Sequence, residues 1–166
     1  PEMVLPIAQA MREIGYKRAF VVHGKSRDEA RGMDELSTLG RSLIAELTED
    51  GTIREYAVRA QDLGIKEADE PSLLHESDRE TEAIKLLRLL SGEDSSSKRD
   101  IICLNAAPLL CITDHASSLK EGMDRASDII DSGKTIKRLK AWVAEQNSDA
   151  SRPLEKLEEM LAQACS

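Results

Sequence analysis

The first hydrophobic positions of the chain recur at helical spacing and then give way to a continuous apolar run. Apolar side chains fall every three or four positions in residues 3–14, and Gly15 follows the last of them. This periodicity predicts an amphipathic helix that ends at the glycine. The next segment, KRAFVVHG at residues 17–24, is apolar at consecutive positions. Such a run is typical of a strand buried on both faces, as in a parallel sheet flanked by helices.

Residues 42–58 show the pattern of a hairpin. Two strand-like runs lie on either side of Asp50 and Gly51. An Asp-Gly pair favours the positive backbone angles of a tight hairpin turn. The sequence therefore predicts that part of the sheet is antiparallel.

A helix and a loop are expected next. Ser77 and Glu80 have the spacing of a capping box ahead of apolar positions between residues 83 and 90, and Gly92 marks the end of that helix. The segment GEDSSSKR, residues 92–99, is polar and rich in serine. It predicts a solvated loop.

The segment after this loop predicts a second buried strand that passes directly into a helix. Residues 100–105, DIICLN, form a short apolar run, and Pro108 follows closely. Asn105 is a suitable N-cap, and Pro108 would then lie in the first turn of the helix.

Three more helices complete the pattern. Ser118 and Glu121 repeat the capping-box spacing before a helix that stops at Gly133, another helix covers the apolar positions in residues 136–143, and an amphipathic stretch begins at Pro153. The whole order predicts an α/β fold: a layered domain with a mixed, partly parallel sheet, a β-hairpin and flanking helices.

Composition narrows the function classes. The 166 residues suit one compact domain, and 23 basic against 31 acidic residues give a formal net charge of −8. An acidic chain is a poor match for nucleic acid or an anionic membrane surface. The three cysteines have no metal-ligand or disulfide spacing, which suits a reducing cytoplasm, and no apolar run is long enough to span a membrane. We therefore expect a soluble, cytoplasmic protein with buried or incidental thiols.

Most familiar site motifs are missing from the sequence. The nine glycines form no GxGxxG turn or P-loop, there is no GxSxG elbow, and the three histidines show no HExxH pattern. The sequence thus supports neither a nucleophile nor a cofactor-binding residue set. His23, at the end of the first strand, is expected to be a structural neighbour of a site.

Asp34 and Glu35 are the remaining candidates for chemistry. The two acids follow the first strand and a charged loop. Adjacent carboxylates suit Mg²⁺ that is shared with the phosphates of a substrate. The alternative is that they are solvated loop charge, which is the commoner role of adjacent acids.

Several segments in a fixed order resemble a known family. These segments are PEMVLPIAQAMREIGYKRAFVVHG, GMDELSTLG, AELTEDGTIREYAV, DIICLNAAPLL and SLKEGMDRASDIIDSGK. From Pro1 to about Trp142, they are similar to the C-terminal portion of anthranilate phosphoribosyltransferases. The resemblance implies an enzyme that joins phosphoribosyl pyrophosphate to anthranilate in tryptophan biosynthesis, and it implies Mg²⁺ held in part by Asp34 and Glu35.

The resemblance also implies limits. Residues 1–147 would be the C-terminal part of the α/β domain, and residues 148–166 a C-terminal helical extension. The family's glycine-rich phosphate loop and anthranilate-binding residues would lie upstream of Pro1, so we expect the isolated chain to lack activity. We also expect a homo-oligomer, because apolar surfaces that the upstream part would cover promote self-association. The loop from Gly24 to Asp34 is longer and more charged than is usual in the family. Two alternatives stay open: a non-catalytic interaction domain, and a nonclassical relative that binds nucleic acid.

Overall fold

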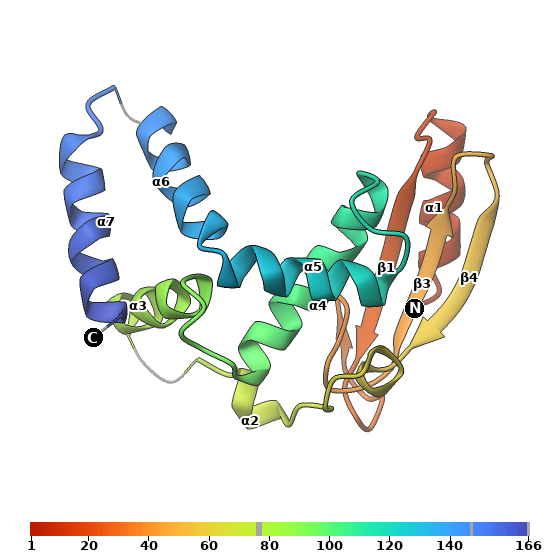
Figure 1. The fold of residues 1–166 in the computed structure, drawn as a ribbon. Coiled ribbons are helices and arrows are strands. Elements are labelled where there is room, and N and C mark those ends of the chain that lie inside the picture. The colour runs from red at the N-terminus through yellow and green to blue at the C-terminus, as the bar shows by residue number, and fades with distance from the viewer. Residues whose placement is uncertain (76–77, 147, 166) are drawn as a thin grey trace.

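A computed structural model describes residues 1–75, 78–146 and 148–165. The first half of the chain forms helix α1 and four strands, and the second half is helical (Figure 1). The elements of the first half are α1 (Val4–Glu13), β1 (Ala19–Lys25), β2 (Gly32–Met33), β3 (Ser42–Leu47) and β4 (Ile53–Val58). A 3₁₀ turn (Ala60–Leu63) then leads to α2 (Glu70–Leu73), α3 (Arg79–Leu90), α4 (Ser97–Ile112), α5 (Leu119–Asp131), α6 (Lys134–Gln146) and α7 (Ser151–Ala164).

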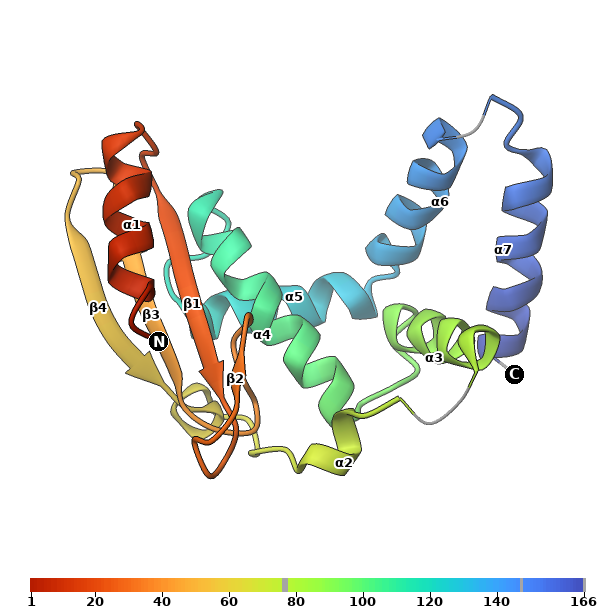
Figure 2. The same cartoon turned by 180° about the vertical axis from the view of Figure 1, so that it is seen from behind.

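The strands form one sheet in the order β2-β1-β3-β4, and every described pair is antiparallel. The expected hairpin is confirmed, because β3 and β4 pair with Leu47 opposite Ile53, and Gly51 in the turn has a φ of +82°. The parallel pairing expected for the first strand is wrong for the described residues. β1 is covered on both faces because α1 packs on one side and α4 on the other (Figures 1 and 2), so its continuous apolar run needs no parallel neighbour.

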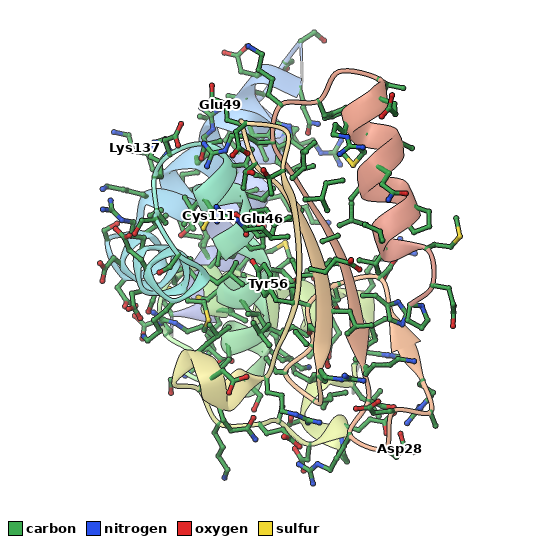
Figure 3. All side chains as sticks on the ribbon, turned by 90° about the vertical axis from the view of Figure 1, so that its right-hand side faces the viewer. Asp28, Glu46, Glu49, Tyr56, Cys111 and Lys137 are labelled. Atoms are coloured by element: carbon green, nitrogen blue, oxygen red, sulfur yellow. The ribbon has the colours of Figure 1, made fainter. Side chains whose placement is uncertain are left out.

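The main core lies between the sheet and the helices α4 and α5. Leu36, Ile44 and Leu104 are almost fully buried there, and Phe20 and Tyr56 pack against them. Figure 3 shows Cys111, Glu46 and Tyr56 in this layer between the helices and the strands. A separate core on the other face of the sheet joins α1 to β1 and β3.

The second predicted strand is wrong. Residues 100–105 lie inside the sixteen-residue helix α4, which begins after its cap Ser96 and continues through Pro108. Periodicity alone cannot separate a short apolar run in a buried strand from one in a buried helix. Here α4 contacts both the sheet and α5, so apolar residues occupy several of its faces.

The helix ends agree only in part with the expected caps. Ser118 caps α5 by accepting a hydrogen bond from the backbone N–H of Glu121, as expected, but the Glu121 carboxylate returns to Ser117 instead of Ser118. Ser77 lies outside the described residues. Asp78 caps α3, since its carboxylate accepts hydrogen bonds from the backbone N–H groups of Glu80 and Thr81.

Helices α3, α6 and α7 gather at the end of the molecule farthest from the sheet (Figure 1). Leu87 of α3 and Leu161 and Ala164 of α7 are buried together there, with apolar side chains of α6 beside them. The amphipathic helix expected from Pro153 is therefore confirmed, and it begins at Ser151. Among the described residues, no helix combines the length and apolar character that crossing a membrane would require.

Candidate functional site

The acidic pair lies directly after the short strand β2. β2 pairs with the end of β1, with Gly24 opposite Met33, and the chain then turns through Asp34 and Glu35. Both side chains are exposed, as expected for a solvent-facing pair. The two carboxylates therefore stand at the edge of the sheet, where a ligand can reach them.

The segment behind the pair is deeply buried. Leu36, Ser37 and Thr38 are each at most 1% exposed. The Ser37 hydroxyl donates to the carbonyl oxygen of Lys25 at 2.8 Å and accepts from the backbone N–H of Leu39 at 3.0 Å. The exposed acids are thus attached to a fixed segment of the core.

The β1 backbone also approaches this segment closely. A Cβ atom at Gly24 would lie 2.4 Å from the carbonyl oxygen of Glu35, well inside contact distance. Only glycine allows the strand and the acidic loop to come this near. The pattern of the sequence contains no direct sign of this contact, although the glycine ends the apolar run.

Asn105 is not the helix cap that the sequence predicts. It lies in the middle of α4, and its side-chain Oδ1 accepts a hydrogen bond from the backbone N–H of Leu36 at 2.8 Å. Its Nδ2 group donates to the Leu36 carbonyl oxygen at 2.9 Å. The cap was an error because it depended on a strand ending at Asn105. A single amide in an apolar stretch at helical spacing was the available signal for a buried polar contact.

The acids of the loop between β1 and β2 already have partners. Asp28 accepts hydrogen bonds from the Ser26 hydroxyl and the Ala30 N–H, and Glu29 pairs with Arg41 at 3.0 Å. In the described part of the chain, no hydrogen-bond donor or cation pairs with the carboxylate of Asp34 or of Glu35. These two groups keep their full capacity to bind a ligand.

Electrostatics at the pair favour a bound cation. The pKa of Glu35 is raised above its ordinary value, first because its carboxyl is partly buried and second because the negative charge of Asp34 lies nearby. A positive ion placed between the carboxylates would relieve that repulsion.

The donor set fits a metal that takes other ligands from a substrate. Two carboxylates supply hard oxygen ligands, and the described residues contain no cluster of three or more His, Cys, Asp or Glu side chains that could enclose an ion. Mg²⁺ is usually bound in this way, through one or two carboxylates together with waters and phosphate oxygens.

His23 stands next to the site as a structural neighbour. A Cβ atom at Gly32, just before the acids, would lie 2.5 Å from the imidazole Cε1, so the ring packs against that backbone. Burial lowers the pKa of His23 because it disfavours the charged ring. Its buried Nε2 has no hydrogen-bond partner among the described atoms.

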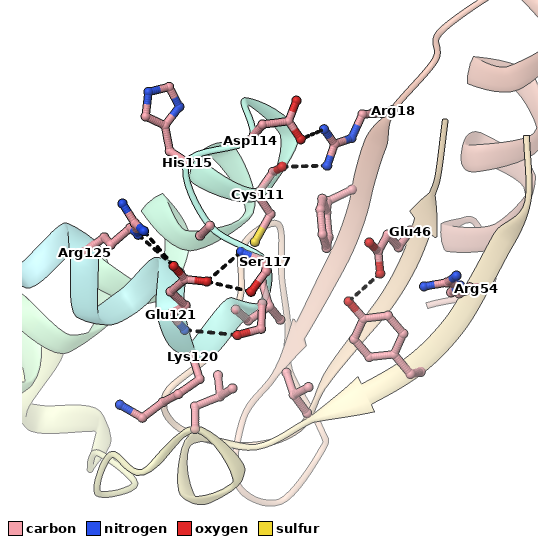
Figure 4. Close-up of a pocket in the computed structure, with 17 residues that line it drawn as sticks. Arg18, Glu46, Arg54, Cys111, Asp114, His115, Ser117, Lys120, Glu121 and Arg125 are labelled. Carbon is pink, nitrogen blue, oxygen red and sulfur yellow. Dashed lines mark hydrogen bonds and ion pairs between the residues drawn. The ribbon is translucent and has the colours of Figure 1, made fainter. Parts of the chain in front are cut away.

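A cleft lies elsewhere, between the sheet and the start of α5 (Figure 4). It has a volume of about 770 Å³, and its charged groups largely neutralise one another. Arg18 pairs with Asp114, and the Glu121 carboxylate accepts hydrogen bonds from Ser117 and Arg125. Neither acid of the candidate pair lines this cleft, so it is separate from the candidate site.

The cysteines give no nucleophile. Cys103 and Cys111 are buried, Cys165 is exposed, and none of the three forms a disulfide. Burial raises the pKa of the Cys111 thiol, which keeps it protonated at neutral pH. The expectation of buried thiols is confirmed for Cys103 and Cys111.

Comparison with known proteins shows the family to which the chain belongs. Residues 1–136 match the model of the glycosyl transferase family, a/b domain. The chain is 38% identical over 138 residues to the anthranilate phosphoribosyltransferase of Staphylococcus aureus strain JH9. That alignment covers 83% of this chain but only 40% of the relative, so the chain spans less than half the length of the curated relatives it matches.

Solved structures agree with the sequence comparison. The crystal structure of the Thermus thermophilus anthranilate phosphoribosyltransferase superposes with a TM-score of 0.72 at 32% identity, covering 87% of this chain and 40% of the other. The Saccharomyces cerevisiae enzyme in complex with PRPP and Mg superposes with a TM-score of 0.65 at 23% identity, covering 82% and 36%. At that lower identity the likeness shows the fold alone.

Proposed function

Because this chain belongs to the glycosyl transferase family and matches part of its a/b domain, we propose that it is the C-terminal portion of an anthranilate phosphoribosyltransferase. The complete enzyme would transfer phosphoribosyl from phosphoribosyl pyrophosphate to anthranilate. The observation that carries this proposal is the unpartnered acidic pair, which is fixed to the core and lies within the segment that matches the family.

Asp34 and Glu35 are the residues that we propose to hold Mg²⁺. The metal would offset the negative charge that grows on the pyrophosphate leaving group as its bond to the ribose breaks. The two carboxylates bind and orient; neither needs to act as a nucleophile or to move a proton. The yeast enzyme with this fold is itself solved in complex with PRPP and Mg.

The chain alone is proposed to be inactive. The described residues offer two carboxylates but no glycine-rich phosphate loop, and metal ligands cannot by themselves position a sugar phosphate and an aromatic acid for reaction. A homo-oligomer, a cytoplasmic location and a C-terminal extension at residues 148–166 are further parts of the proposal. Neither alternative, a non-catalytic interaction domain or a nonclassical relative that binds nucleic acid, is favoured by a specific feature of the described residues.

Activity measurements test the proposal directly. The purified chain should give no steady loss of anthranilate fluorescence with phosphoribosyl pyrophosphate and Mg²⁺. A fusion in which this chain replaces the matching 138 residues of the Staphylococcus aureus relative should restore that loss. The matched control is the same fusion with Asp34→Asn and Glu35→Gln. A folded, inactive fusion, or an active isolated chain, would contradict the proposal.

A further inference from the structure

The side chain of Asn105 makes three hydrogen bonds, and two of them link α4 to Leu36, the residue after the acidic pair. Oδ1 accepts from the backbone N–H of Leu36 at 2.8 Å, and Nδ2 donates to the Leu36 carbonyl oxygen at 2.9 Å. The second Nδ2 hydrogen is directed to the carbonyl oxygen of Ile101, one turn earlier in α4, at 3.0 Å. The last contact fixes the amide on its own helix, so the other two fix Leu36 relative to that helix.

The position of Leu36 makes this contact relevant to the acids. Leu36 is the residue directly after Glu35, and its side chain is fully buried beneath α4. Among the described residues, Asn105 provides the only side-chain hydrogen bonds to the backbone of residues 34–36. Among the described residues, the carboxylates of Asp34 and Glu35 make no hydrogen bond or ion pair that would hold their backbone in place.

Helix stability does not explain the asparagine. Asn is a poorer helix former than Ala in a helix interior, and its polar amide must be fully paired when it is partly buried. Asn105 sits well inside α4, between apolar neighbours. The benefit of the residue therefore lies in the contact with Leu36.

We propose that Asn105 is a positioning residue that holds the backbone beside Glu35, and thereby sets the spacing of the Asp34 and Glu35 carboxylates for a divalent cation. The inference rests on the metal role proposed above. The asparagine does not touch the metal or the substrate; it acts through the main chain of Leu36.

The first measurement tests the hydrogen bonds between Asn105 and Leu36 in the 166-residue chain. Asn105→Ala should raise the hydrogen-exchange rate of the Leu36 amide about tenfold, which is the effect of losing roughly one net hydrogen bond. The control is Thr135→Val, which removes a different inter-helix hydrogen bond, from the Thr135 hydroxyl to the Leu90 carbonyl at 2.6 Å. It should leave the Leu36 rate unchanged. Asn105→Asp keeps the shape and removes the donor, so it provides a second variant if the alanine form is poorly folded.

The second measurement concerns cation binding in the fused enzyme, with Mn²⁺ as the probe and phosphoribosyl pyrophosphate present. The Mn²⁺ dissociation constant, read by electron paramagnetic resonance, should rise about five- to tenfold in Asn105→Ala and stay at the parent value in Thr135→Val. Excess metal should recover most of the rate in Asn105→Ala. A general loss of stability would instead lower the rate at every metal concentration.

The outcomes separate the inference from the function on which it rests. If Glu35→Gln weakens Mn²⁺ binding but Asn105→Ala and Asn105→Asp do not, the positioning role is wrong and the metal role stands. If Glu35→Gln itself leaves Mn²⁺ binding unchanged, the metal role is wrong and the inference fails with it. An unchanged Leu36 exchange rate in both Asn105 variants would show directly that Asn105 does not hold the Leu36 backbone.

Discussion

Glu35 is open to solvent and also lies in an environment that disfavours its negative charge. Its side chain is exposed, yet partial burial of the carboxyl and the neighbouring Asp34 raise its pKa. A group of this kind is stabilised in its charged form by a cation and not by the rest of the protein. In the loop before β2, the Asp28 carboxylate instead accepts hydrogen bonds from its own loop.

In the fused enzyme, Glu35→Gln should raise the Mg²⁺ concentration needed for half the maximal rate and should lower that rate. The loss of transition-state stabilisation should be about 2 to 4 kcal/mol, as for removal of one preorganised electrostatic contact. A Mg²⁺ titration of the rate measures both effects. Glu55→Gln is the matched control, because Glu55 is an exposed glutamate on β4 away from the pair. If Glu35→Gln kept the kinetics of the parent, the metal role would be wrong, and the two acids would be ordinary solvated charges of a loop.

At the scale of the elements, α4 and α5 pack closely against each other where they cross. Gly122 of α5 faces Ala107 of α4, and a Cβ at Gly122 would lie 2.8 Å from the Cα and the Cβ of Ala107. Both residues are buried. The two backbones therefore come closer here than any larger side chain would allow.

Gly122→Ala should lower the free energy of unfolding by about 1 to 2 kcal/mol. The cost of forcing α4 and α5 apart should exceed the gain of roughly 1 kcal/mol in helix propensity. Urea unfolding followed by circular dichroism measures the change. Asp128→Ala, at an exposed position of the same helix, should change stability by less than about 0.5 kcal/mol. Equal stability of Gly122→Ala and the parent would show that the helices can separate at little cost.

The start of α5 should also be sensitive to acid. Hydrogen bonds from the Ser117 hydroxyl and N–H, and from Arg125, lower the pKa of Glu121 to about 2. Because the folded-state pKa lies below the ordinary value of 4.5, the stabilisation is present above pH 4.5 and is lost as the pH falls towards 2. The melting temperatures of the parent and Glu121→Gln should thus differ at pH 6 and converge as the pH is lowered. A constant difference between them would exclude ionisation as its source.

At the scale of the whole molecule, apolar side chains remain uncovered on the helical half. Leu109 of α4 is 64% exposed and Trp142 of α6 is 58% exposed. Trp142 borders an apolar groove between α5 and α6 that also includes Ile129 and Leu139. Exposed apolar surface of this kind promotes association with another surface.

The isolated chain should therefore self-associate into a dimer or a larger assembly. Sedimentation velocity over a range of concentrations measures this, and the mean sedimentation coefficient should increase with concentration. A single species of about 18 kDa at the highest concentration would contradict the prediction.

Several features could be predicted from the sequence because they depend on neighbours along the chain. The spacing of apolar residues in α1 and α7, the Asp50–Gly51 turn and the cap at Ser118 are local signals, and each agrees with the structure. The ordered segments also identified the family, since their order and spacing constrain the chain more than any single motif does. The exposed position of the acidic pair followed from its place after a strand and a charged loop.

Tertiary packing decided the rest. Residues 100–105 belong to a helix, and β1 pairs only in the antiparallel direction among the described strands, because a continuous apolar run records burial on several sides but not the element or strand direction that causes it. The contacts of Asn105 with Leu36 and of Gly24 with Glu35 join residues far apart in the sequence or on different elements. Contacts of this kind leave no periodicity, so the way the acidic pair is held in place emerged only once the helices and the sheet were assembled.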